Sequence, residues 1–144
     1  MVEYREMREE DLDEVCKLEE ATFSMPWRRQ DFADMIVQDH LLYIVAVFDN
    51  IIVGGCGLRN IVGEGEITNV TVARVYRNQG IGTDLVEYIL QRGCKMGITA
   101  FTLEVRKSNL AAIHLYEKLG FVTEGLRTNF YEKPCEDALI MWKR

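Results

Sequence analysis

Two side chains of this chain are suited to proton transfer, and the first is Glu104. It lies in the alternating stretch Phe101–Arg106, which predicts a strand with Thr102, Glu104 and Arg106 on one face. A carboxylate near a strand end could accept a proton from an amine, directly or through water. The alternative is an exposed strand residue that pairs with Arg106 or a lysine.

The second is Tyr116, which follows Asn109 by seven residues, or about two helical turns. Both residues therefore lie on one face of the helix expected over Leu110–Leu119. A phenol has a pKa of about 10 and an alkyl thiol about 8.5, so a neutral tyrosine could protonate a departing thiolate. The alternative is an aromatic side chain packed in the core.

A glycine-containing loop, Arg77-x-x-Gly80-x-Gly82, joins an expected strand to an expected helix. Its backbone N–H groups, at the partly positive start of the helix, favour a phosphate. A P-loop is excluded because Thr83 and Asp84 follow Gly82 where lysine is needed, and a dinucleotide fingerprint is excluded by Leu85. A simple strand-to-helix turn is the alternative.

The elements that must position these residues follow from periodicity and turn signals. The expected helices are Glu9–Ala21, Arg29–Gln38, Ile81–Met96 and Leu110–Leu119. The expected strands are Val2–Arg5, Leu42–Phe48, Ile51–Asn60, Glu66–Val72, Phe101–Arg106, Phe121–Arg127 and Ala138–Trp142, with a loop over Asn129–Asp137.

The third of these helices has a length suited to a crossover, so the strands ending near Val72 and Val105 should be parallel neighbours. Ligands bind at the carboxyl ends of such strands, which would bring Glu104 near the glycine loop. Glycines at 54, 55 and 57 indicate a bulge or a close backbone approach in the preceding strand.

Composition predicts one domain spanning residues 1–144, with 48% hydrophobic and 28% charged residues. A charged start and the lack of a long apolar run indicate neither a signal peptide nor a membrane span, which favours the cytoplasm. The net charge of −6 argues against nucleic acid and suits a basic substrate. The four cysteines and two histidines are dispersed, so no metal site or disulfide framework is expected. Oligomeric state is not predicted.

Several motifs together resemble the GCN5-related N-acetyltransferase superfamily, and within it the bacterial ribosomal-protein-alanine N-acetyltransferases. The similarity covers nearly the whole chain. The matching stretches are Pro26-Trp27 with Phe32, Arg77–Gly82, Leu103–Arg106, Ser108-Asn109, Ala112, Leu115–Phe121, Asn129–Tyr131 and Glu136–Ala138.

The resemblance implies an α/β (α+β) fold: a mixed, mostly antiparallel sheet of six to seven strands, flanked by about four helices and splayed where acetyl-CoA binds. It implies Glu104 as proton acceptor and Tyr116 as proton donor, without a covalent acetyl-cysteine. The implied acetyl-CoA contacts are the pantetheine residues Val70, Thr71, Val72 and Asn109 and the pyrophosphate residues Arg77, Asn78, Gln79, Gly80, Ile81, Gly82 and Thr83.

The expected activity is acetyl transfer from acetyl-CoA to a protein N-terminal α-amine, with a ribosomal protein that begins with alanine as the implied substrate. A backbone N–H near Val72 would polarise the thioester carbonyl. Two alternatives stay open: acetylation of a small amine or an internal lysine, and a non-catalytic acyl-CoA-binding sensor. Retention of both Glu104 and Tyr116 favours an enzyme.

Overall fold

The computed structural model describes residues 1–144 as seven strands and four α-helices. The helices are α1 (Leu12–Thr22), α2 (Arg29–Val37), α3 (Ile81–Lys95) and α4 (Leu110–Lys118), with short 3-10 turns at Glu9–Asp11 and Arg74–Tyr76. The strands are β1 (Glu3–Glu6), β2 (Leu41–Phe48), β3 (Ile51–Ile61), β4 (Glu64–Val72), β5 (Ala100–Arg106), β6 (Val122–Tyr131) and β7 (Glu136–Lys143).

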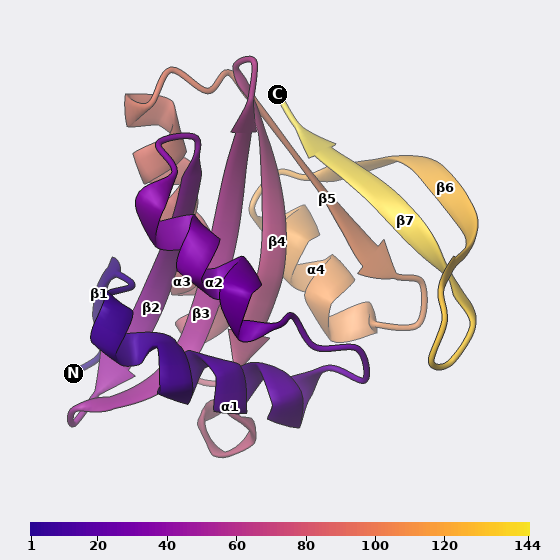
Figure 1. The fold of residues 1–144 in the computed structure, drawn as a ribbon. Coiled ribbons are helices and arrows are strands. Elements are labelled where there is room, and N and C mark those ends of the chain that lie inside the picture. The colour runs from indigo at the N-terminus through magenta and orange to yellow at the C-terminus, as the bar shows by residue number, and fades with distance from the viewer.

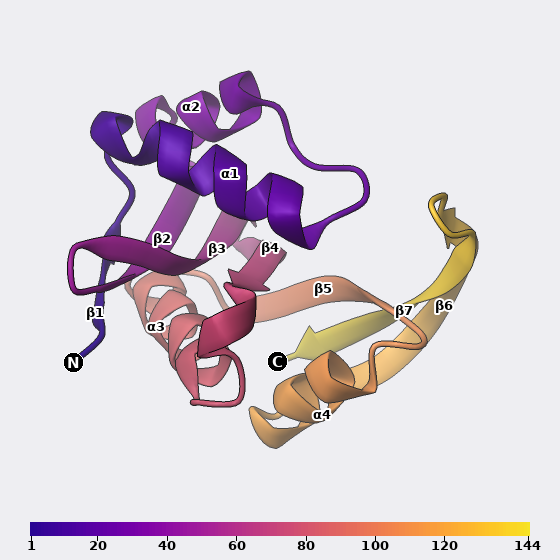
Figure 2. The ribbon, with the colours of Figure 1, turned by 90° about the horizontal axis from the view of Figure 1, so that it is seen from below.

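The strands form one sheet in the order β1-β2-β3-β4-β5-β7-β6, and only β4 and β5 run parallel. Helices α1 and α2 cover one face of the sheet, and α3 and α4 lie on the other (Figure 1, Figure 2). The main core contains fully buried Ile44, Leu58, Leu85 and Ile89 between the sheet and α3. The fold class predicted from the sequence is therefore confirmed. No helix is both long and apolar enough to cross a membrane.

The parallel pair β4–β5 separates along its length. The two strands pair only at their starts, where Glu64, Gly65 and Glu66 face Ala100, Phe101 and Thr102. Beyond these residues β5 turns away from β4 together with β7 and β6 (Figure 1). The sheet is thus splayed at the carboxyl ends of its two central strands, as predicted.

A bulge interrupts the pairing of β3 with β4 next to this opening. Gly57 pairs with Thr68 and Gly55 with Thr71, so Cys56 alone opposes Asn69 and Val70. The extra residue therefore lies on β4, and Asn69 adopts a left-handed φ of 48°. A close approach of the backbone, one of the two predicted alternatives for the glycines, is confirmed, since a Cβ on Gly54 would lie 2.9 Å from the Thr71 carbonyl oxygen.

The last hairpin differs from the prediction. The expected loop over Asn129–Asp137 is wrong at both ends, because β6 continues to Tyr131 and β7 begins at Glu136. Three β6 residues between Arg127 and Tyr131 oppose one β7 residue, and Asn129 has a φ of 53°. Because this irregular part of β6 lacks the alternation by which a strand is recognised in a sequence, it was predicted as a loop, although Phe130 and Tyr131 favour extended structure.

Candidate active site

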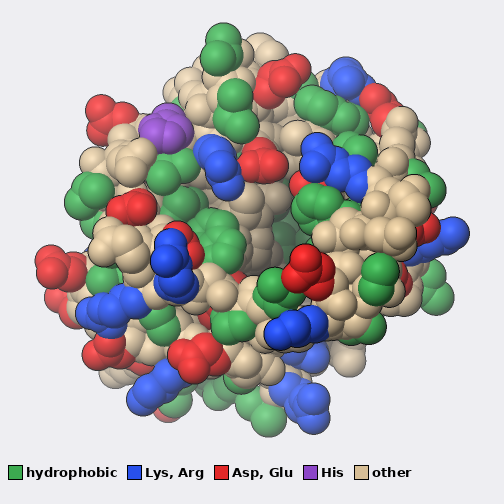
Figure 3. All heavy atoms as spheres, turned by 45° about the vertical axis from the view of Figure 1, so that its right-hand side comes forward, with side chains coloured by type: hydrophobic (Ala, Val, Ile, Leu, Met, Phe, Trp, Pro, Cys, Tyr) green, Lys and Arg blue, Asp and Glu red, His purple; other side chains and the backbone are tan.

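Two cavities meet at the splayed end of the sheet. The first, the carboxylate cavity, has a volume of about 440 Å³ and contains Glu19, Glu66 and Glu104 on its walls. The second, the loop cavity, has a volume of about 390 Å³ and is bounded by the glycine loop and α4. Val70 and Tyr116 line both cavities. Figure 3 shows a hollow on this side of the molecule, with hydrophobic side chains inside and charged side chains around it.

The loop cavity gathers ten of the eleven residues expected to contact a cofactor. These are Val70, Thr71, Val72, Arg77, Asn78, Gly80, Ile81, Gly82, Thr83 and Asn109. Gln79 does not line the cavity, and its amide instead lies 3.5 Å from the Val75 carbonyl oxygen. The structure thus brings the strand end, the loop and the α4 start together around one space.

The loop is shaped by its glycines and by Arg77. Gly80 precedes α3 with a left-handed φ of 84°, which suits glycine and leaves the first α3 N–H groups open to the cavity. The Arg77 guanidinium Nε donates a hydrogen bond to the Val72 carbonyl oxygen at 3.0 Å, so it ties the loop to the end of β4. An anion at the α3 start would meet backbone donors and the helix dipole.

Asn109 begins α4 and faces the same cavity. Its side-chain oxygen accepts a hydrogen bond from the Ala112 N–H at 3.2 Å, which caps the helix as the sequence predicts. The carboxamide NH₂ group stays available to a ligand in the loop cavity.

Tyr116 is buried at the junction of the two cavities. It is 7% exposed, and its ring packs edge-on against Phe121 with centroids 5.9 Å apart. The hydroxyl makes no hydrogen bond to another protein group, and burial raises the pKa of Tyr116 well above its usual range. The phenol is therefore neutral near pH 7 and carries a proton that it can donate.

Glu104 projects into the carboxylate cavity from β5. The alternative in which Glu104 pairs with Arg106 is wrong, because the Arg106 guanidinium lies 3.3 Å from Glu136 on the neighbouring strand β7. Arg127 of β6 instead places its Nε 2.9 Å from Glu104 Oε2, although the two are not aligned as a hydrogen bond. Burial raises the pKa of Glu104, Arg127 opposes this rise, and Glu66 adds to it. Such a carboxylate is a stronger base than an exposed glutamate.

Glu19 lines the same cavity and was missed in the sequence. It is 2% exposed on α1, where the buried residues are Leu12, Val15 and Glu19. Their spacing places a carboxylate within the apolar stripe of an amphipathic helix. That position was a signal, because an unpaired acid in such a stripe needs a specific reason to be buried.

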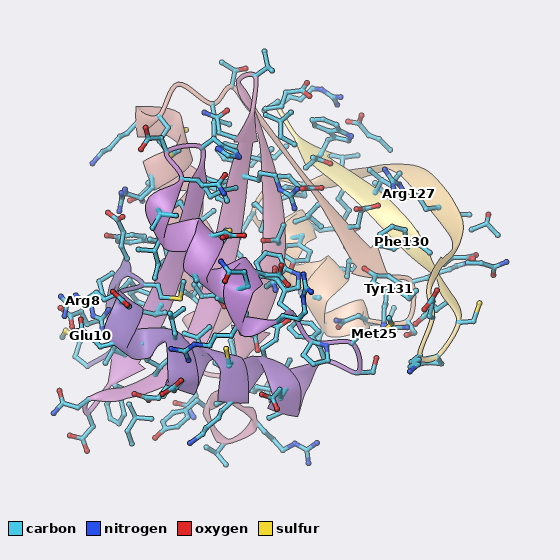
Figure 4. All side chains as sticks on the ribbon, in the orientation of Figure 1. Arg8, Glu10, Met25, Arg127, Phe130 and Tyr131 are labelled. Carbon is cyan, nitrogen blue, oxygen red and sulfur yellow. The ribbon has the colours of Figure 1, made fainter.

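The outer part of the carboxylate cavity lies between two segments far apart in sequence. Met25 comes from the α1–α2 connection, and Phe130 and Tyr131 come from the end of β6, on the side opposite Arg8 and Glu10 (Figure 4). Ser24 Oγ donates to the Lys133 carbonyl oxygen at 2.5 Å, which joins the two segments. Met25 and Phe130 stay more than 40% exposed, at 53% and 42%. Apolar side chains thus form the rim of a cavity whose walls carry three carboxylates.

A family model for the acetyltransferase (GNAT) family matches residues 12–121. The chain belongs to this family. That match includes β4, the glycine loop, Glu104 and Tyr116, and it identifies the protein as an acyltransferase of the N-acetyltransferase type. No group of three or more His, Cys, Asp or Glu side chains gathers as a metal site in this acetyltransferase.

Relatives of this acetyltransferase extend the similarity over nearly the whole chain. A putative [ribosomal protein bS18]-alanine N-acetyltransferase from Bacillus subtilis is 34% identical, covering 96% of this chain and 92% of the relative. The [ribosomal protein bS18]-alanine N-acetyltransferase of Escherichia coli K12 is 33% identical, with coverages of 91% and 89%. The crystal structure of the Escherichia coli ribosomal-protein-S18-alanine N-acetyltransferase matches with a TM-score of 0.90 at 30% identity, covering 99% of this chain and 93% of that one.

Proposed function

We propose that this acetyltransferase uses acetyl-CoA to acetylate the N-terminal α-amine of a protein, namely the alanine that begins a small ribosomal-subunit protein. The observation that carries the proposal is the junction of the two cavities at Val70 and Tyr116. One cavity offers backbone donors for a phosphate, and the other offers carboxylates for an amine. The relatives named above support the choice of a ribosomal protein.

Acetyl-CoA would fit the loop cavity as co-substrate and would supply an activated acetyl thioester. The open N–H groups at the α3 start suit its pyrophosphate, and the Asn109 amide and the β4 end suit the pantetheine amides. A Cβ on Gly82 would lie 3.2 Å from Leu115 Cδ1 on the α4 wall of the cavity, so glycine there lets the start of α3 lie close to α4.

The acceptor amine would enter through the carboxylate cavity. Its nitrogen attacks the acetyl carbonyl carbon, and the C–N bond forms as the C–S bond breaks. Glu104 accepts the proton that the amine loses, directly or through water, and Tyr116 gives its proton to the departing sulfur. A peptide α-amine has a pKa near 8, against about 10.4 for lysine, so a carboxylate deprotonates the α-amine more readily.

Acidic walls and an apolar rim suit the proposed substrate class. The carboxylates favour a cationic N-terminus, and Met25, Phe130 and Tyr131 offer apolar contacts to the residues that follow it. The net charge of −6 also favours a basic protein partner over free nucleic acid. Modification of a ribosomal protein would place the reaction in the cytoplasm.

The test is release of free thiol from acetyl-CoA on addition of a peptide beginning with alanine and arginine, followed by mass spectrometry. The proposal expects acetylation at the α-amine only. An N-terminally blocked peptide with an internal lysine and a polyamine serve as controls. Equal reaction of the blocked peptide would refute the N-terminal assignment. Acetyl-CoA binding without turnover on any amine would favour the sensor alternative.

A further inference from the structure

Glu19 is a buried carboxylate without a basic partner. Its Oε2 accepts hydrogen bonds from the Trp27 backbone N–H and the Asn69 amide, each at 3.1 Å, and its Oε1 lies 3.3 Å from the same amide. No lysine or arginine forms an ion pair with it. The other two carboxylates of the cavity differ, because Glu66 pairs with Arg59 and Glu104 with Arg127.

The two donors that meet at Glu19 belong to segments that shape the site. Trp27 lies in the connection from α1 to α2, just beyond Met25 of the cavity rim. Asn69 is the left-handed residue of the β4 bulge, a conformation that residues other than glycine adopt at a cost. Glu19 therefore links the substrate-side connection to the one irregular point of β4.

The bulge in β4 includes Val70, one of the two residues that line both cavities. Neither Asn69 nor Val70 has a partner in the register of β4 with β3 or β5, so the regular ladder is interrupted at these two residues. Val70 nevertheless lines both cavities, as Tyr116 does. A small rotation at Asn69 would move the Val70 peptide relative to an acetyl group at the junction.

We propose that Glu19 is a positioning residue that holds Asn69 in its left-handed conformation and so aims the Val70 backbone at the reacting groups. This inference rests on the function proposed above. A buried carboxylate without a cation is a costly way to fill a core position, and an apolar side chain of similar volume would serve stability better. The presence of a carboxylate here is explained by the two donors that it brings together.

The chain offers matched variants for a test. Glu19→Ala removes both contacts, and Glu19→Gln keeps one oxygen able to accept them. Asn69→Gly keeps the left-handed conformation accessible while removing the contact with Glu19. Glu20→Gln is the control, because Glu20 is the exposed neighbour on the same helix.

Three readouts separate positioning from a structural role. We expect Glu19→Ala to lower kcat with the alanine peptide by roughly 10- to 100-fold, because misplacement of about 1 Å costs on this scale. Glu19→Gln should retain more activity. Acetyl-CoA affinity should change less than about twofold in both variants, because neither substitution alters a residue of the loop cavity. NMR signals of the Trp27 N–H and the Asn69 side-chain NH₂ should move in Glu19→Ala and stay in Glu20→Gln.

Combining Glu19→Ala with Asn69→Gly tests whether the effect passes through the bulge. The double variant should be no slower than the slower single variant, because the two substitutions break the same contact. Independent, multiplied losses would overturn the proposal, and so would wild-type kcat with unmoved signals in Glu19→Ala. Should Glu19→Ala fail to fold, Glu19→Gln and Asn69→Gly give the same comparison. An inactive wild-type enzyme would refute the proposed function, whereas the NMR signals would still test the contact.

Discussion

Replacing Tyr116 with phenylalanine separates catalysis from packing at the junction of the cavities. The substitution deletes one hydroxyl and keeps the ring that packs against Phe121 at 5.9 Å. That hydroxyl has no protein hydrogen-bond partner, so its loss leaves no other group unsatisfied. The free energy of unfolding should therefore change by less than about 1 kcal/mol.

Turnover should respond far more strongly. General acid catalysis contributes about 10²- to 10⁴-fold, so loss of the proton donor should raise the barrier by about 2.7 to 5.4 kcal/mol at 1.36 kcal/mol per tenfold. Acetyl-CoA affinity should stay nearly unchanged, because the loop and the α4 start keep their contacts. Tyr116→Ala, in contrast, should also lose about 3–5 kcal/mol of stability through a core cavity.

The assay combines steady-state kinetics with the alanine peptide, calorimetric binding of acetyl-CoA and urea unfolding. Tyr43→Phe is the control, since Tyr43 is 2% exposed, packs edge-on against Phe32 and lines neither cavity. The assignment of Tyr116 as proton donor is refuted if Tyr116→Phe keeps wild-type kcat, or if Tyr43→Phe loses as much. In either case Tyr116 would be a packing residue.

Three further outcomes are expected. Glu104→Gln should lower kcat/KM by about 10²- to 10⁴-fold. Because burial raises the Glu104 pKa, the acid limb of the wild-type pH–rate profile should lie at a higher pH than the pKa of an exposed glutamate. Arg127 opposes this rise, so Arg127→Gln should move the acid limb to a still higher pH. Gly80→Ala should lower the free energy of unfolding by about 1–2 kcal/mol through the left-handed conformation alone, since open space surrounds the new Cβ. It should also weaken acetyl-CoA binding measured by calorimetry. Burial tends to raise the Asp11 pKa, but hydrogen bonds from Arg5 and the Arg8 N–H lower it overall. Asp11 therefore stabilises the fold above its unfolded-state pKa, and this stabilisation is lost as pH falls through the folded-state pKa. Asp11→Asn should lower the free energy of unfolding by about 1–3 kcal/mol at pH 7 and by little in acid, with exposed Glu10→Gln as the control.

The sequence predicted the parts of the fold that depend on local pattern. The strict alternation of Phe101–Arg106 and the stripe of α3 correspond to regular elements, and the crossover rule placed β4 beside β5. Glycines and a helix cap marked the loop cavity, because backbone N–H groups at a helix start need no particular side chain. Glu104 and Tyr116 could be chosen as candidates, but the arginine that faces Glu104 could not. Arg127 reaches it from β6, a strand whose irregular register hides its alternation.

Glu19 and Asn69 show which part of the site the sequence leaves open. The place of Glu19 in an apolar stripe marks it as unusual, but it does not name a partner, and an asparagine in a strand has no preferred partner either. Their contact arises only when α1 crosses the sheet and brings a carboxylate within hydrogen-bond distance of a residue fifty positions away. β5 separates from β4 before Asn69, and the bulge leaves Asn69 and Val70 without a register partner on β3, so the contact from Glu19 adds a constraint where the ladder is interrupted. If Glu19 positions Asn69 as proposed, the opening of the sheet and the buried acid beside it are parts of one arrangement.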